Sequence, residues 1–174
     1  GGYNVIIENM LKDVEVELGV DFFANRQELE ASAEKVVFTG MIDQYFDYKH
    51  GELEYRSLRF EHEVLDEENY QGNAVVNYTE REIPYTRIIE HKHFEYGTQD
   101  KTVITREYPA DWKRGDEPYY PINDERNNAM FAKYQEEAAQ NDKVIFCGRL
   151  ADYKYYDMHV VIERALNVVE EEFK

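Results

Sequence analysis

The sequence has few of the features that mark secreted, membrane or nucleic-acid-binding proteins. Its 174 residues include a single cysteine, Cys147, which excludes an internal disulfide and disfavours a disulfide-dependent secreted scaffold. No apolar run approaches the ~18–20 residues that cross a bilayer, and no signal-like apolar segment follows a basic start. Only 20 Lys and Arg stand against 37 Asp and Glu, a net charge of −17 that disfavours nucleic acid. These absences predict a cytoplasmic protein with no nucleic-acid and no membrane partner.

The chain also lacks an initiator methionine and opens on a glycine pair, which indicates a fragment of a longer protein. What it does contain is enough apolar surface for a folded core, with 43% hydrophobic residues. Tyrosine is unusually frequent, at 15 residues. Because a tyrosine combines a flat apolar face with a hydroxyl, it suits both the edges of a core and polar ligand sites.

The pattern of apolar residues predicts an α+β fold. Helices are expected at residues 4–11, 25–33 and 123–140 and from Asp157 to the end. Strands are expected at residues 14–18, 35–40, 53–64, 74–79, 85–96, 101–108 and 144–146. The short connections within residues 53–108 join antiparallel neighbours, so an antiparallel sheet of at least four strands forms the expected centre.

The last helix carries apolar residues at three- and four-residue spacing, which predicts one buried stripe. Its members are Met158, Val161, Ile162, Ala165, Leu166, Val169 and Phe173.

The segment 148–158 is the most informative for function. A buried strand passes through Gly148 and a loop into a helix that begins at Asp157, and a helix N-terminus offers unpaired N–H groups to anionic ligand atoms. Arg149 beside it can supply a bidentate phosphate contact. The alternative is that Asp157 only caps the helix and the neighbouring tyrosines only pack.

Other candidate residues also allow two interpretations. Arg87 begins a strand and could bind an anion, or form the cross-strand ion pair common for such arginines. Tyr119 and Tyr120 lie between two prolines, on a stiffened loop that could aim their hydroxyls at a ligand or pack them in a turn. His91 and His93 share one face of a predicted strand, but zinc needs three or four convergent ligands, so no metal site is predicted.

Two further interpretations limit the chemistry. Cys147 follows an apolar strand and is expected to behave as a small buried hydrophobe rather than a nucleophile. No G-x-G-x-x-G and no P-loop is present, so the chain has no nucleotide phosphate loop of its own.

Several motifs, in order along nearly the whole chain, resemble those of prokaryotic UDP-galactopyranose mutases. They are TGMIDQYFDY (39–48), GELEYRSL (51–58), QGNAVVNY (71–78), PYTRIIEH (84–91), DEPYYP (116–121) and YKYYDMH (153–159). The resemblance implies a flavoprotein that interconverts UDP-galactopyranose and UDP-galactofuranose for cell-surface glycan synthesis. In that family the N5 atom of reduced FAD displaces UDP from the sugar, and ring opening and reclosure of the flavin–sugar adduct precede the return of UDP.

The resemblance also implies roles for individual residues. Arg87 matches a catalytic arginine that grips the UDP diphosphate, and Tyr120 and Tyr155 match substrate-binding tyrosines on the same group. Asp157 matches an active-site aspartate near both substrate and flavin. The remaining cofactor contacts match Arg149, at the FAD pyrophosphate, and Met158, at the flavin end of the last helix.

The same resemblance implies three parts. Residues 1–50 and 123–174 would be remnants of a Rossmann-like FAD-binding domain, with two short strands and the C-terminal helix, and residues 51–122 an antiparallel substrate domain. The glycine motif, a mobile loop and a second essential arginine would lie before Gly1. We therefore expect the chain alone to be inactive, not to retain FAD, and to self-associate through unpaired strand edges. A non-catalytic sugar-nucleotide-binding module is the alternative.

Overall fold

The computed structural model describes residues 2–173, and the chain divides into two compact units, Gly1–Val36 and Val37–Lys174. The first unit contains α1 (Asn4–Met10) and α2 (Phe22–Ser32), which confirms both predicted helices. The Asp21 side chain caps α2 by accepting a hydrogen bond of 2.8 Å from the Ala24 amide. The strand predicted at residues 14–18 is wrong, because alternation alone does not provide a partner strand: this segment is exposed and pairs with no described strand.

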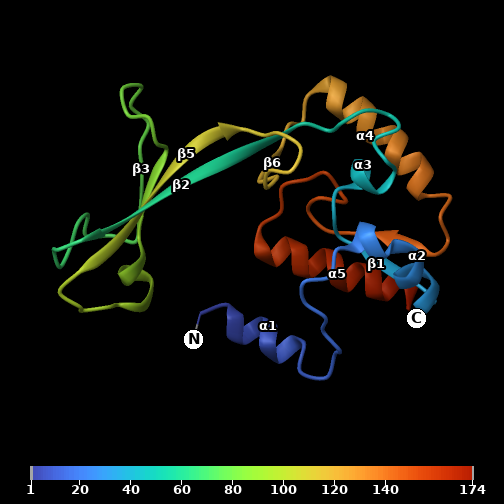
Figure 1. Cartoon of the computed structure of the whole chain (residues 1–174), viewed down its shortest axis with the longest axis horizontal. Helices are drawn as coiled ribbons and strands as arrows, with labels where there is room; N and C mark the ends of the chain where they lie inside the picture. Colours follow the sequence, from blue (N-terminus) through green and yellow to red (C-terminus); the bar gives the residue numbers. More distant parts are fainter. Residues whose placement is uncertain (1, 174) are drawn as a thin grey trace. The chain divides into compact units, whose positions relative to one another are not determined.

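The second unit is built around a five-stranded antiparallel sheet, as predicted (Figure 1). The strands, in spatial order, are β3 (Val75–Asn77), β4 (Arg87–Glu90), β5 (Thr102–Asp111), β2 (Tyr55–Leu65) and β6 (Tyr120–Pro121). The long pair β2–β5 forms its centre, in a register that runs from Arg56 opposite Asp111 to Leu65 opposite Thr102. This register fixes which residues of β2 and β5 share a face.

The strand predicted at residues 85–96 is only partly correct, because β4 ends at Glu90 and a 3₁₀ helix, η1 (His91–Glu95), follows it. The chain must reverse here to enter β5. Tyr96 adopts a left-handed conformation with φ of 54°, and the buried Lys92 ammonium donates hydrogen bonds to two loop carbonyls. These local requirements override the alternating pattern.

Glu90 is a fully buried carboxylate that joins the loop at residues 66–74 to the sheet. It accepts hydrogen bonds from the amides of Tyr70 (3.0 Å) and Gln71 (2.9 Å) and from the Thr102 hydroxyl (2.8 Å), and His93 Nε2 lies 3.0 Å away. Burial raises the pKa of Glu90, but these donors outweigh burial and lower that pKa to about 2. Glu90 is therefore ionised at neutral pH.

The rest of the second unit packs around an aromatic core. It contains β1 (Val36–Phe38) and β7 (Val144–Phe146), which form a two-stranded sheet, and helices α3 (Ile42–Tyr45) and α4 (Glu125–Ala138). The fully buried core cluster consists of Ile42, Leu53, Tyr55, Tyr134 and Tyr153. Both short strands and the helix at 123–140 were predicted; their membership of a larger nucleotide-binding sheet, and the division into three parts, stay predictions.

Tyr153 connects three segments of this unit through one hydroxyl. The hydroxyl donates to the carbonyl oxygens of Glu54 and Ile122 and accepts a hydrogen bond of 3.1 Å from the Ile122 amide. The residue is 2% exposed, and burial raises the pKa of the phenol well above its usual value. The start of β2, the end of β6 and the loop before the last helix are thereby held together.

The last helix, α5 (Met158–Glu172), begins where it was predicted, with Asp157 at the N-cap. The prediction of a buried apolar stripe is wrong, because Leu166 is 61% exposed and Val169 55% exposed, while Val168 is buried. The spacing of apolar residues shows that the helix is amphipathic, but it does not show that another element packs on the apolar side. No element within residues 37–173 covers this stripe.

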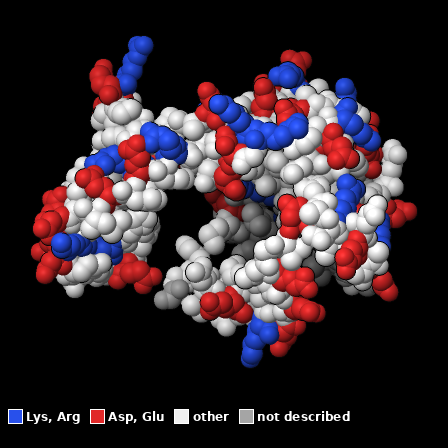
Figure 2. Space-filling view, viewed as in Figure 1, with Lys and Arg blue, Asp and Glu red and all other residues white. Residues whose placement is uncertain are grey.

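None of the described helices is long and apolar enough to cross a bilayer. Figure 2 shows carboxylates spread over the visible face with lysines and arginines between them, and no broad basic patch on that face.

Replacing the buried carboxylate of Glu90 by an amide tests its structural role. We expect Glu90→Gln to lower the free energy of unfolding at pH 7 by about 1.5–3 kcal/mol, because a charged acceptor of buried N–H groups is lost. Since the pKa of Glu90 is lowered on folding, its contribution is present above about pH 4.5 and is lost as the pH falls toward 2. Urea unfolding at pH 7 and pH 3 should show the difference from wild type shrinking at the lower pH. Glu67→Gln, in an exposed turn, is the control, and an equal effect of both changes contradicts the role of Glu90.

Removing only the hydroxyl of Tyr153 tests the second anchor. Tyr153→Phe leaves the Glu54 carbonyl and both backbone groups of Ile122 without this partner, so we expect a loss of about 1–3 kcal/mol in the free energy of unfolding. Tyr96→Phe makes the same chemical change at a side chain that is 90% exposed. Thermal and urea unfolding should separate the two variants, and equal stability contradicts the anchoring role.

Candidate functional site

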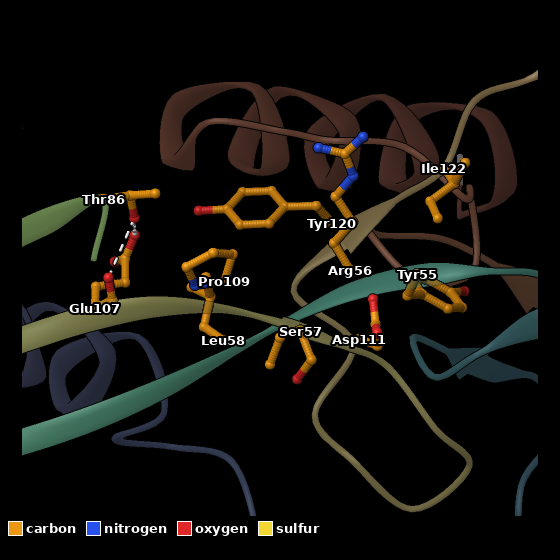
Figure 3. A pocket seen from close by; sticks show the side chains of 11 residues that line it. Tyr55, Arg56, Ser57, Leu58, Thr86, Glu107, Pro109, Asp111, Tyr120 and Ile122 are labelled. Carbon is orange, nitrogen blue, oxygen red and sulfur yellow. Dashed lines mark hydrogen bonds between the residues drawn. The ribbon is translucent and has the colours of Figure 1, made fainter. Parts of the chain in front are cut away.

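A pocket of about 640 Å³ lies on the sheet where β2, β5 and β6 meet (Figure 3). Its wall includes Arg56 and Leu58 of β2, Glu107 and Pro109 of β5, Tyr120 of β6, and Thr86 just before β4. In Figure 3 the Tyr120 side chain points across the pocket toward the wall that carries Thr86 and Glu107. Pairing in the sheet, rather than closeness in sequence, brings these residues together.

Arg56 is a pocket residue that the sequence analysis did not single out. It lies opposite Tyr120 in the β2–β6 register, and its side chain is exposed. Within residues 2–173 its guanidinium has no hydrogen-bond or ion-pair partner, although the net charge is −17. The signal in the sequence was its place inside the motif at residues 51–58, but only the strand register shows that it shares a site with Tyr120.

Arg87, a predicted site residue, is held beside this pocket by two neighbours on the sheet. Its Nε donates a hydrogen bond of 3.0 Å to Asn77 Oδ1 on β3, and its Nη1 lies 3.5 Å from Glu107 Oε2 on β5. The cross-strand ion pair that sequence reasoning allowed for Arg87 is therefore present. Among the described residues Arg87 makes no polar contact with Tyr120 or Tyr155, so it joins the pocket only through the lining residue Glu107.

Tyr120 and Tyr155, also predicted together, lie next to each other with ring centroids 5.7 Å apart and an interplanar angle of 31°. Tyr120 belongs to the short edge strand β6, whereas Tyr155 is 54% exposed and lies in the loop before α5. Arg149 also connects the loop before α5 to the segment that leads into β6, because it donates a hydrogen bond to the carbonyl oxygen of Tyr119.

The loop that presents Tyr155 is shaped by Asp152. This carboxylate accepts hydrogen bonds from the amide of Gly148 (3.1 Å), the hydroxyl of Tyr156 (3.1 Å) and Nε of Arg164 (3.3 Å). Gly148 has φ of +100°, a conformation that favours glycine. The loop is therefore pinned at both ends, before and after Tyr155.

Asp157 stands at the N-cap of α5, but its side chain accepts no hydrogen bond from the first turn of that helix. The carboxylate instead interacts with Tyr155, and its negative charge, together with a hydrogen bond, raises the pKa of the Tyr155 phenol. Simple capping by Asp157 is thus excluded. Met158, the first residue of α5, has a side chain that is 55% exposed, and the helix start next to it stays free for an acceptor.

The remaining candidates do not add chemistry. His91 lies in η1 rather than on a strand; its Nε2 is 2.6 Å from the Thr105 hydroxyl, which also lies 2.7 Å from His62 Nδ1. Within residues 2–173 no group of three or more His, Cys, Asp or Glu is arranged to hold a metal ion. Cys147 is free and buried, and burial raises the pKa of its thiol, as expected for a small hydrophobe.

These residues are suited to bind an anion. Arg56 and Tyr120 line the pocket, Arg87 contacts its lining residue Glu107, and Tyr155 lies next to Tyr120. Each of these guanidinium and phenol groups can donate to phosphate oxygens. The free start of α5 and Arg149 form a second set of donors around the same loop.

The contact between Tyr155 and Asp157 can be tested by titration. Because the Asp157 carboxylate raises the pKa of Tyr155, Asp157→Asn should lower that pKa toward its ordinary value near 10. NMR titration of tyrosine labelled at the ring would follow the phenol directly. Asp116→Asn is the control, and a Tyr155 pKa that is identical in all three proteins contradicts the contact.

Comparison with known proteins gives a consistent result. The family model described as UDP-galactopyranose mutase matches residues 1–155. A dTDP-fucopyranose mutase of Escherichia coli is 35% identical over 97% of the chain, and a probable UDP-galactopyranose mutase of Klebsiella pneumoniae is 36% identical over 98%. A UDP-galactopyranose mutase of Mycoplasma pneumoniae is 34% identical over 98%.

The match covers only 46%, 44% and 46% of these three relatives, so the chain spans a little under half their length. Within the chain, the family model extends from residue 1 to residue 155, which ends before α5. The chain belongs to the UDP-galactopyranose mutase family.

Proposed function

We propose that this chain is the diphosphate-binding part of a flavin-dependent mutase that interconverts UDP-galactopyranose and UDP-galactofuranose for cell-surface glycan synthesis. The observation that carries the proposal is the pocket wall, where the guanidinium of Arg56 has no partner within residues 2–173 of a strongly acidic chain and lies in register with Tyr120. An unpaired cation in such a chain favours an anionic ligand. Membership of the mutase family supports a sugar nucleotide as that ligand.

In this proposal the diphosphate is held by Arg87, Arg56, Tyr120 and Tyr155. The guanidinium groups supply charge and paired donors, and the two phenols fix the direction of the phosphate oxygens. Negative charge grows on the diphosphate as the bond to the sugar breaks, so donors aimed at it stabilise the leaving UDP. Asp157 lies beside Tyr155, and its charge raises the pKa of that phenol.

The described residues fit the FAD that the family implies. The start of α5 is not capped by a side chain, and Arg149 lies in the loop that leads to it, so backbone N–H groups and a guanidinium are available for a pyrophosphate. We assign Arg149, Asp157 and Met158 to the cofactor side of the site. When bound and reduced, FAD supplies the nucleophile for the anomeric carbon, and no catalytic nucleophile from the protein is required.

The identity of the sugar nucleotide has a second candidate. The E. coli relative is named for dTDP-fucopyranose and is as similar to this chain as the UDP-galactopyranose mutases are. The four residues proposed to hold the diphosphate do not distinguish the two substrates, because both contain a diphosphate. dTDP-fucopyranose is therefore tested beside UDP-galactopyranose.

The activity belongs to the complete gene product rather than to these 174 residues. The chain spans 44–46% of its relatives, so we propose that it is inactive alone, does not retain FAD alone and associates with copies of itself. We also propose that the protein is located in the cytoplasm.

Turnover by the complete gene product tests the mutase function. With reduced FAD it should convert UDP-galactofuranose to UDP-galactopyranose, and Arg87→Ala and Arg56→Ala should each lower kcat/KM by about 100-fold, because each removes a donor to the leaving diphosphate. Arg59→Ala is the matched control, since this arginine of β2 stacks on Tyr108 away from the pocket wall. Chromatographic separation of the two sugar nucleotides gives the rates.

Two other results of the turnover experiment would change the proposed function. Conversion of dTDP-fucopyranose alone would change the substrate and keep the mechanism. A gene product that binds UDP-sugars but turns over neither substrate with reduced FAD would support the non-catalytic sugar-nucleotide-binding module instead.

A further inference from the structure

The pocket contains a carboxylate that an anion-binding site does not obviously need. Glu107 lines the pocket, lies directly opposite Arg87 in the β4–β5 register and is only 7% exposed. A buried negative charge at such a place opposes the approach of a diphosphate, because like charges repel more strongly where water is partly excluded. Its presence in the pocket wall therefore requires a compensating role.

The contacts of Glu107 show what that role is. Its Oε1 accepts a hydrogen bond of 3.3 Å from the Thr86 hydroxyl, and the Thr86 amide donates to the Glu107 carbonyl at 2.9 Å. The other carboxylate oxygen, Oε2, lies 3.5 Å from Arg87 Nη1. The carboxylate is thus fixed from one side by Thr86 and contacts Arg87 with its other oxygen.

Arg87 is consequently held at two of its three nitrogen atoms. Asn77 accepts from Nε at 3.0 Å, Glu107 lies beside Nη1, and Nη2 has no partner among residues 2–173. An arginine side chain loses rotamer entropy when it is ordered. Ordering it before the ligand arrives removes that cost from binding, as in any preorganised site.

We propose that Glu107 is a positioning residue that orients the Arg87 guanidinium toward a nucleoside diphosphate. The inference rests on the diphosphate site proposed above. The proposal is distinguished by the direction in which it expects the affinity for the diphosphate to change when Glu107 is neutralised. Simple charge repulsion predicts that neutralising Glu107 strengthens the binding of an anion, whereas positioning predicts that the same change weakens it.

The test measures the affinity of the complete gene product for UDP by isothermal titration calorimetry. Glu107→Gln should weaken UDP binding about tenfold, and Arg87→Ala should weaken it at least as much. In the Arg87→Ala background, Glu107→Gln should change the affinity by less than about twofold, because Glu107 acts through Arg87. Glu107→Asp keeps the charge but withdraws the carboxylate from Arg87, and it should also weaken binding.

A matched control uses another cross-strand pair of the same sheet, in which Arg106 Nη1 lies 2.7 Å from Glu63 Oε2. Glu63→Gln breaks this pair outside the pocket wall and should leave UDP affinity unchanged. Urea unfolding of each variant separates loss of folding from loss of binding, because a merely structural role of Glu107 would not vanish in the Arg87→Ala background.

The outcomes are distinct. Unchanged or tighter UDP binding by Glu107→Gln overturns the positioning role while the diphosphate site stands. A tenfold loss that persists in the Arg87→Ala background also overturns it. A wild-type protein that does not bind UDP removes the diphosphate site itself, and the role of Glu107 with it.

Discussion

The hydroxyl of Tyr153 is the constraint on which the functional site depends. Three backbone groups from two distant segments meet at this one atom: the carbonyl of Glu54, at the start of β2, and both polar groups of Ile122, just after β6. The Tyr153 ring packs on Tyr55 and Phe131 in the core. Because Tyr120 and Tyr155 are each only two residues from these anchors, the distance between their rings follows from this hydrogen-bonded junction.

The site also shows how a strongly acidic protein can keep cations available for an anion. Most arginines of the sheet have a carboxylate partner, such as Arg106 with Glu63 and Arg59 with Glu61. Arg56 is different: it lies opposite Asp111 on β5 and Tyr120 on β6, yet its guanidinium forms no ion pair among the described residues. Pairing with acids therefore occupies these sheet arginines and leaves the guanidinium of Arg56 without such a partner among the described residues. The overall charge carried no information about this local arrangement.

Local patterns predicted the elements that depend on local features. The central strands have alternating residues and short connections, and the end of β7 has a glycine, so these elements and the antiparallel sheet could be read directly. Prediction failed where the outcome depended on a partner elsewhere: no strand pairs with residues 14–18, and no element within residues 37–173 covers the stripe of α5. Arg56 belongs to the same class, since only the register with β6 shows that it lies opposite Tyr120. The roles of Arg87, Tyr120 and Tyr155 were inferred by resemblance and stay predictions, whereas the ion pair that holds Arg87 became visible only with the sheet.

The buried Glu90 has a consequence for the motions of the far end of the sheet. The loop at residues 66–74 is polar and largely exposed, which is typical of segments that open independently and are cut by proteases. Here two of its amides, those of Tyr70 and Gln71, are bonded to a carboxylate inside the sheet, so lifting the loop would remove two hydrogen-bond donors from a buried, ionised group. The two amides should therefore exchange with solvent deuterium only when β4 itself opens. A surface loop and an inner strand behave as one cooperative unit.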